Sequence, residues 1–333
     1  MKIHPLGRTG LQVTNLCLGT MTFGNQADKK TCFEILDKTF AHGVNFIDTA
    51  DVYPIGRASY AIAGATESII GEWLQGKRDK VVLATKCFGA MGPEANDKGL
   101  SRKHIMTAVE DSLRRLKTDY LDLYQTHQFD PITPMDETLR AFDDLVGQGK
   151  VRYIGVSNWR AWQVAKANGI ADRKNYTRIV SVQPRYNLLF RMIEDDLVPM
   201  ALDEGIGIIS YNPLAGGMLT GRYGKNESIQ EGTRFGLGNN AGLLYRERYW
   251  QEASFDAVER YQSWCREHNH DPVTTAVRWV TQQRGITSAI IGASRPEQLD
   301  ASLRAADMNE LTEQELAWLD GLWFSLPRRQ EFS

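Results

Sequence analysis

The chain has 333 residues, of which 42% are hydrophobic, and its formal net charge is −2. A chain of this length and composition can bury a sizeable core, as a globular protein does. Because a charge this close to zero gives no overall basic field, we do not expect nucleic acid as a partner.

Membrane, disulfide and metal signals are weak in this sequence. No apolar run approaches the roughly 18 residues that span a bilayer, so we predict a cytoplasmic protein without a membrane partner. The four cysteines are scattered and form no C-x-x-C pair, which indicates reduced thiols. His268 and His270 do not share a helix face and have no third ligand nearby, so no metal site is predicted.

Short apolar runs alternate with segments of helical apolar spacing along the chain. The predicted strands are 15–20, 44–48, 80–86, 120–127, 151–157, 179–183, 205–211 and 286–292. The predicted helices are 30–42, 66–76, 103–116, 136–148, 160–170, 194–204, two pieces within 249–283, and 296–305. Eight strand–helix units favour an α/β fold, a (β/α)8 TIM barrel, with residues 1–333 as a single domain.

A doubly wound open sheet is the competing fold. It usually carries G-x-G-x-x-G after its first strand, whereas here that strand leads into GTMTFGNQADKK. Two segments exceed the barrel pattern. Residues 1–14 are expected to form an N-terminal hairpin that closes the barrel floor, and residues 212–247 a long loop at the mouth after the seventh strand.

Polar residues stand where three neighbouring predicted strands end. Asp48 closes the second strand, Lys86 the third and His127 the fourth, and Tyr53 follows Asp48 by five residues. The carboxyl ends of barrel strands share one rim, so we expect these four side chains in one cleft. Asp51, in the same loop as Tyr53, is expected to be only a loop or helix-cap residue.

This set of side chains suits the protonation of a carbonyl oxygen while a hydride reaches its carbon. A phenol titrates near 10. A Lys86 cation, paired with Asp48, would lower the pKa of Tyr53 and so help it to donate a proton. His127 could donate a hydrogen bond to a substrate oxygen or pass a proton to Tyr53. Each residue alone also has a purely structural explanation, and the four together carry the argument.

The motifs around these residues resemble those of the aldo-keto reductases, NADPH-dependent carbonyl reductases that fold as a (β/α)8 barrel. NFIDTADVY resembles the family's block with the catalytic Asp and Tyr, LATK its Lys block, and DLYQTH its His block. The resemblance implies a catalytic tetrad of Asp48, Tyr53, Lys86 and His127. GVSNW, QPRYNLL and NPLAGGMLTGRY resemble the bacterial branch related to the voltage-gated potassium channel β subunits.

The resemblance also implies which residues bind NADP(H). Ser157, Asn158 and Gln183 would hold the nicotinamide carboxamide, and Tyr211 would stack on the ring. The other implied cofactor residues are Gly19, Thr20, Met21 and Asp48 at the first two strands; Asn212, Pro213, Leu214, Gly217, Thr220, Arg222 and Arg234 along the pyrophosphate; and Gly292, Ser294, Arg295, Gln298 and Ser302 around the adenosine phosphate.

The adenosine end departs from the family pattern. Relatives commonly read EQLxEN where this chain reads EQLDAS, which puts Ala301 and Ser302 in place of an adenine-binding Glu and Asn. Two polar contacts are therefore weakened. Arg295 favours NADP(H) over NAD(H), because a guanidinium fork fits the 2'-phosphate.

The sequence favours NADPH-dependent reduction of an aldehyde or ketone to the alcohol. The alternative is a redox-sensing regulatory protein that binds NADP(H), with slow incidental reductase chemistry. The channel β subunits carry Asn where this chain has His127, which favours the enzyme. The substrate and the direction of reaction stay open, and a homo-oligomer is compatible with the resemblance. Candidate substrate contacts are Tyr53, His127, Phe88 and Trp159, with Ile55, Arg57 and Tyr60 as further candidates in the loop after Tyr53.

Overall fold

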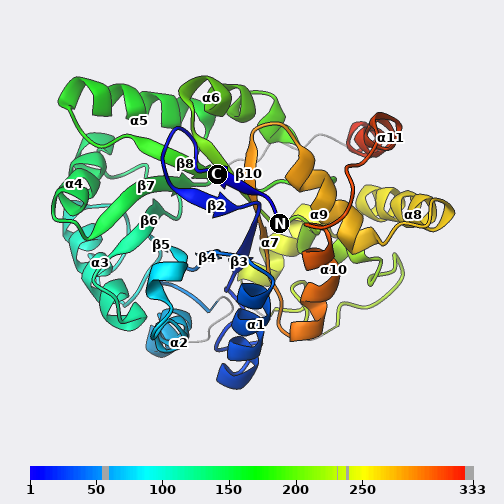
Figure 1. Ribbon diagram of the computed structural model, residues 1–333, viewed down its shortest axis with the longest axis horizontal. Helices are drawn as coiled ribbons and strands as arrows, with labels where there is room; N and C mark the ends of the chain where they lie inside the picture. The colour runs from blue at the N-terminus through cyan, green and yellow to red at the C-terminus, as the bar shows by residue number, and fades with distance from the viewer. Residues whose placement is uncertain (55–59, 231, 238–239, 327–333) are drawn as a thin grey trace.

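The computed structural model describes residues 1–54, 60–230, 232–237 and 240–326, so Ile55 and Arg57 lie outside the described residues. Within this part of the chain, eight parallel strands close into a barrel in chain order, and the last strand returns to pair with the first (Figure 1). The strands are β3 (Leu16–Gly19), β4 (Phe46–Asp48), β5 (Val82–Cys87), β6 (Leu121–Thr126), β7 (Val151–Ser157), β8 (Ile179–Gln183), β9 (Gly207–Tyr211) and β10 (Ile286–Ile291). The predicted (β/α)8 barrel is confirmed.

Helices surround this ring of strands on its outer side (Figure 1). Several begin at a side chain that accepts a backbone N–H, as Asp28 does for α1 and Ser101 for α3. The helices between strands are α1 (Lys29–Ala41), α2 (Ala65–Trp73), α3 (Arg102–Leu116), α4 (Met135–Gly147), α5 (Ala161–Lys174) and α6 (Leu197–Glu204), and then α7 (Asn240–Tyr249), α8 (Glu252–Glu267) and α9 (Pro272–Gln282) between β9 and β10. α10 (Leu299–Arg304) and α11 (Glu313–Phe324) follow β10.

Two helices were missed by the sequence prediction. α7 begins inside the segment expected to be a loop, residues 212–247, and ends two residues beyond it; the same segment contains the 3-10 helix η4 (Ala215–Thr220), and α11 lies beyond the last predicted helix. In both α7 and α11 the apolar residues are spread around the helix rather than gathered on one side. Such helices give no 3.6-residue apolar period for a sequence reading to detect.

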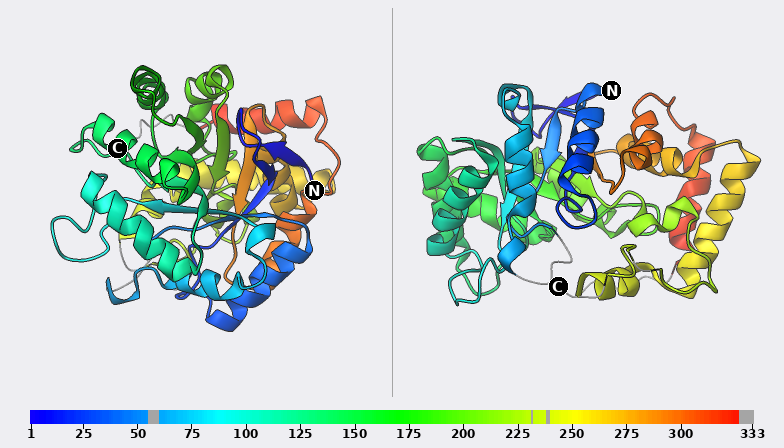
Figure 2. Two further views of the ribbon diagram at one scale, coloured as in Figure 1. Left: turned by 60° about the vertical axis from the view of Figure 1, so that its left-hand side comes forward. Right: turned by 90° about the horizontal axis from the view of Figure 1, so that it is seen from below.

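The N-terminal hairpin closes the barrel floor, as predicted. β1 (Ile3–Pro5) pairs antiparallel with β2 (Gln12–Thr14). Leu6 and Val13 pack against inward-facing side chains of the barrel strands, and this cluster comprises Leu6, Val13, Cys17, Phe46, Val82, Ala84, Leu123 and Ile209. At Gly7 a Cβ would stand 2.6 Å from the Gly205 carbonyl oxygen, so the hairpin approaches the barrel backbone where only glycine fits. The hairpin and α7 lie at opposite ends of the barrel (Figure 2).

Three further features of the described residues bear on the sequence predictions. None of their helices combines the length and apolar character needed to cross a bilayer. They contain no group of three or more His, Cys, Asp or Glu side chains placed to hold a metal ion. His270 instead contacts Glu315, with Nε2 2.6 Å from its Oε1. All four cysteines are buried and free.

Candidate active site

A buried ion pair lies at the rim of the barrel, as the sequence predicted. Asp48 is the last residue of β4, and Lys86 lies on the neighbouring strand β5. The Lys86 Nζ stands 2.5 Å from Asp48 Oδ2 and donates to the Thr49 carbonyl oxygen at 2.9 Å. Burial, the largest single influence, lowers the pKa of Lys86, but the charge and hydrogen bond of Asp48 and the other neighbouring groups together outweigh it, so the pKa of Lys86 is raised. Lys86 therefore keeps its charge although it is fully buried.

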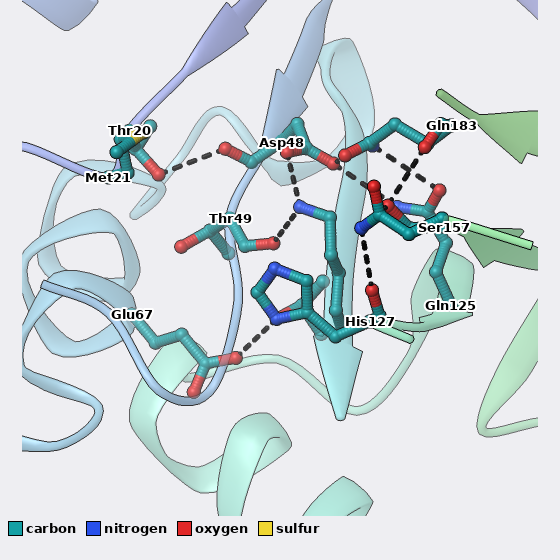
Figure 3. Close-up of polar contacts among 12 residues, drawn as sticks. Thr20, Met21, Asp48, Thr49, Glu67, Gln125, His127, Ser157 and Gln183 are labelled. Carbon is teal, nitrogen blue, oxygen red and sulfur yellow. Dashed lines mark hydrogen bonds and ion pairs between the residues drawn. The ribbon is translucent and has the colours of Figure 1, made fainter. Parts of the chain in front are cut away.

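The second carboxylate oxygen of Asp48 accepts two side-chain amides. Gln183 Nε2 donates to Oδ1 at 2.8 Å and Gln125 Nε2 donates at 3.1 Å. Figure 3 shows both glutamines directed toward Asp48. Sequence reasoning missed Gln125, although it stands two residues before His127 and strand alternation puts both on the interior face. These contacts fix the orientation of the carboxylate that holds Lys86.

Tyr53 and His127 face the cleft above this pair. Their rings meet edge to face with centroids 5.7 Å apart, and Lys86 Nζ lies 5.4 Å from the centre of the Tyr53 ring. Burial raises the pKa of the Tyr53 phenol, and the Lys86 cation offsets only part of this increase. The expectation that Lys86 lowers this pKa below its ordinary value is therefore wrong in its net direction. Tyr53 carries its proton at neutral pH and can donate it.

The imidazole of His127 is neutral. Burial, and secondarily the positive charge of Lys86, lower its pKa to about 3. A neutral imidazole has one N–H to donate but no extra proton to give up near pH 7. Of the two roles considered for His127, this favours a hydrogen bond to a substrate oxygen over the transfer of a proton to Tyr53.

A connected polar surface continues over β7, β8 and β9. Asn158, in the left-handed region with φ 59°, donates from Nδ2 to the His127 carbonyl oxygen at 3.0 Å. The Tyr211 hydroxyl donates to Asn158 Oδ1 at 2.8 Å, and Ser157 Oγ donates to the Gln183 carbonyl oxygen at 2.9 Å. The four residues predicted to hold the nicotinamide are thus brought together.

These residues line a cleft of about 2490 Å³. All residues predicted to bind NADP(H) line this cleft, and so do the four main substrate candidates Tyr53, His127, Phe88 and Trp159. Lys86 does not line the cleft, because it is fully buried below Tyr53. Trp159 packs edge to face on Phe129 with ring centroids 5.1 Å apart, and both line the wall together with Phe88. Tyr60, at the start of the short helix η1 (Tyr60–Ile62), is not among the lining residues.

Several residues of the cleft fit a phosphate-bearing cofactor. The predicted cofactor residues Arg222, Arg234 and Arg295 are among the arginines that line it, and arginine suits the binding of phosphate oxygens. Gly217 lies in the left-handed region with φ 98°, and a Cβ there would stand 3.3 Å from the Tyr223 ring, so a side chain would be strained at this turn. The cleft therefore carries both guanidinium groups suited to phosphates and the side-chain amides around Tyr211, a combination that fits a nicotinamide dinucleotide.

The long segment between β9 and β10 is tied to the loop after β3. Arg234 Nη1 contacts the Met21 Sδ and donates to the Tyr245 hydroxyl, each at 2.9 Å. Gln26 Nε2 donates to the Gly232 carbonyl oxygen at 2.9 Å. The predicted cofactor residues Met21 and Arg234, 213 positions apart in the chain, are thus brought into contact.

Known proteins share much of this sequence. The sequence model described as the Aldo/keto reductase family matches residues 15–323. The chain is 40% identical over 317 residues to the uncharacterized oxidoreductase YrpG of Bacillus subtilis, covering 93% of this chain and 92% of the relative. It is 37% identical over 314 residues to a probable voltage-gated potassium channel subunit beta of Arabidopsis thaliana, covering 92% of each. A putative aryl-alcohol dehydrogenase of Schizosaccharomyces pombe is 31% identical over 360 residues, with 98% of this chain and 97% of the relative covered.

Proposed function

This chain belongs to the aldo/keto reductase family, and from that premise we propose that it reduces an aldehyde or ketone to the alcohol with NADPH, reversibly. Its oxidoreductase relatives support the general class of activity. The observation that carries the proposal is the position of a protonated Tyr53 and a neutral His127 above the buried pair of Asp48 and Lys86. Such an arrangement suits proton donation to a carbonyl oxygen.

Each of these side chains has a separate task in the proposed reaction. The N–H of His127 orients the carbonyl oxygen, and Tyr53 donates its proton to that oxygen. Lys86 stabilises the phenolate that remains, and Asp48 holds Lys86 in place. The nicotinamide, when bound, supplies the hydride. In the reverse direction the Tyr53 phenolate takes the proton of an alcohol.

The cleft residues would hold NADP(H) along its length. Ser157, Asn158 and Gln183 would bind the carboxamide, with Tyr211 beside the ring. Arg295 would bind the 2'-phosphate that distinguishes NADP(H) from NAD(H). Its Nε lies 3.1 Å from Glu297 Oε1 on the surface, and exposed pairs of this kind contribute little energy. Phosphate can therefore replace Glu297 as the partner of Arg295 at small cost.

Aromatic carbonyl compounds are the first substrates to test. The aromatic side chains Phe88, Phe129 and Trp159 line the cleft, and flat aromatic substrates pack well against such walls. A relative named as a putative aryl-alcohol dehydrogenase points the same way. The panel should also contain aliphatic aldehydes, methylglyoxal, pyridoxal and sugars, so that the preference is measured rather than assumed.

The decisive experiment is the substitution Tyr53→Phe. We expect carbonyl reduction, followed by NADPH absorbance, to fall by about 10²- to 10⁴-fold because the proton donor is lost. NADPH affinity, from the quenching of protein fluorescence, should change by no more than about threefold, since only a hydroxyl is removed. Tyr153 lies in β7 but packs against the apolar cluster of Leu6 and Val13 at the hairpin end of the barrel. Tyr153→Phe is therefore the matched control and should retain full activity. Turnover retained in Tyr53→Phe contradicts the assignment.

A redox-sensing binding protein is the second candidate. The observation in its favour is the 37% identity to a protein named as a probable potassium channel subunit beta. This candidate predicts negligible NADPH consumption across the whole carbonyl panel together with cofactor that stays bound through gel filtration. The reductase predicts turnover of at least one carbonyl class.

A further inference from the structure

We propose that the ion pair between the buried Glu67 and Arg115 positions Tyr53 relative to Lys86, and so controls proton transfer from outside the cleft. The proposal rests on the proposed function of Tyr53 and Lys86. Glu67 is fully buried in α2, and Arg115 lies near the end of α3. Neither residue lines the cleft, so both would act through other residues.

Glu67 is joined to the strand that carries Lys86. Its Oε1 accepts the Thr85 hydroxyl at 2.6 Å. Thr85 directly precedes Lys86 on β5, and strand alternation directs Thr85 toward the helices while Lys86 points into the barrel. Figure 3 shows Glu67 set apart from the group around Asp48. The carboxylate of Glu67 therefore holds the outer side of the strand whose inner side presents the lysine.

Arg115 connects the same carboxylate to the loop of Tyr53. Its Nε donates to Glu67 Oε2 at 2.7 Å. Its side chain packs so closely on Gly64 that a Cβ there would overlap it, and Gly64 also has a left-handed φ of 79°. The Gly64 N–H donates to the Tyr53 carbonyl oxygen at 3.0 Å. Because of this φ, a residue other than glycine would be strained between Arg115 and the backbone of Tyr53.

These contacts close a path from Tyr53 through Gly64, Arg115, Glu67 and Thr85 to Lys86. Glu67 is fully buried and Arg115 is 19% exposed, and such a pair resists displacement because Glu67 left alone would be an uncompensated buried charge. The distance between Tyr53 and Lys86 matters for two reasons. The electrostatic effect of the lysine on the phenol falls with separation, and small misplacements of reacting groups slow catalysis strongly.

An ion pair beside the start of β5, between Arg78 before that strand and Asp122 on β6, provides a matched control. Arg78 Nη2 lies 2.7 Å from Asp122 Oδ2, and the same oxygen accepts the Leu83 backbone N–H at 2.9 Å. This pair also joins β5 to its neighbours and is largely buried, with side-chain exposures of 17% and 14%. It lies at the start of the strand rather than near Lys86 and contacts no proposed reacting group. Its loss should affect folding without affecting chemistry.

The experiment compares Glu67→Gln with Asp122→Asn on the full-length protein. Both should lower the midpoint of thermal unfolding. We expect Glu67→Gln to lower kcat about 30-fold with KM and the NADPH Kd within about threefold, because orientation rather than binding is lost. Asp122→Asn should keep kcat within about twofold, since no proposed reacting group is moved.

Thr85 supplies a milder pair of variants in case Glu67→Gln does not fold. Thr85→Val has nearly the same shape and keeps the ion pair but loses the hydroxyl that joins it to β5. Thr85→Ser keeps that hydroxyl. We expect Thr85→Val to lower kcat about fivefold, the effect of one buried hydrogen bond of about 1 kcal/mol. Thr85→Ser should keep kcat within about twofold of the wild-type value.

A pH profile separates positioning from general weakening. Alcohol oxidation needs the Tyr53 phenolate, so its rate rises with pH through the pKa of that phenol. If Lys86 is less well placed in Glu67→Gln, the pH at which the oxidation rate rises should increase by about 1 unit. It should stay unchanged in Asp122→Asn.

Unchanged kcat and an unchanged pH profile in both Glu67→Gln and Thr85→Val would overturn the proposal and leave the Glu67–Arg115 pair a purely structural one. A wild-type protein without turnover would instead contradict the proposed function on which this inference depends.

Discussion

The two ends of the barrel bury opposite kinds of side chain. At the floor, Leu6 and Val13 of the hairpin pack on apolar residues such as Phe46, and their burial stabilises the fold. At the rim, Lys86 is equally buried but needs Asp48 beside it, because removing a charge from water is costly unless it is paired. One ring of strands thus buries an apolar cluster at one end and carries the proposed chemistry at the other, as barrel enzymes do.

The strongest test of this division is Lys86→Met at the rim. We expect kcat to fall by about 10²- to 10⁴-fold because the phenolate of Tyr53 loses its stabilising cation. The free energy of unfolding should also fall, by about 3–5 kcal/mol, because Asp48 stays buried without its partner. Single-turnover kinetics and urea unfolding measure the two effects. An active Lys86→Met protein would show that the rim pair is structural only.

Leu6→Ala makes the corresponding change at the floor. Leu6 is fully buried in the cluster under the barrel, so the free energy of unfolding should fall by about 2–5 kcal/mol. The folded fraction should keep its kcat, since no rim residue loses a contact. Activity normalised to the folded fraction, at a temperature below unfolding, measures this. A large fall in kcat would break the separation between the two ends.

The pH dependence of stability tests the rim again, with a smaller effect. The pKa of folded His127, about 3, is below the ordinary value near 6.5, so the unfolded chain binds this proton first. The stabilising contribution of neutral His127 is complete above pH 6.5 and is lost progressively as the pH falls toward 3. The free energy of unfolding, measured with urea between pH 7 and pH 4, should therefore fall less steeply with decreasing pH in His127→Asn than in the wild type. An equal dependence of this free energy on pH in the two proteins would contradict a buried neutral imidazole.

The smallest expected effect concerns the outer end of the cleft. Arg295→Gln should raise the Kd for NADPH about tenfold, the value of one hydrogen bond to a charged group, and leave the Kd for NADH unchanged. Arg304→Gln is the control, because Arg304 is exposed to a similar extent and pairs with Asp271. Isothermal titration with both cofactors measures the difference. Equal losses for NADPH and NADH would show that Arg295 does not recognise the 2'-phosphate.

Much of the fold and the site could be predicted from local patterns. The strand runs and the spacing of Asp48, Lys86 and His127 indicated a barrel with one shared rim, because both follow from chain periodicity. The direction of the pKa shift of Tyr53 could not be predicted, since it depends on a balance between burial and the distance to Lys86. Glu67 was also missed, because a buried carboxylate in a helix looks like any solvent-facing one until its partners are known.

The pairing of β10 with β3 has a consequence for the growing chain. Until residue 291 has been synthesised, β3 and β9 each present an edge of unpaired backbone groups, a template on which other chains can aggregate. Gly292, Arg295 and Gln298, proposed to hold the adenosine phosphate, follow the closing strand directly. The proposed cofactor site would therefore be completed only after the last open edges of the barrel have been sealed.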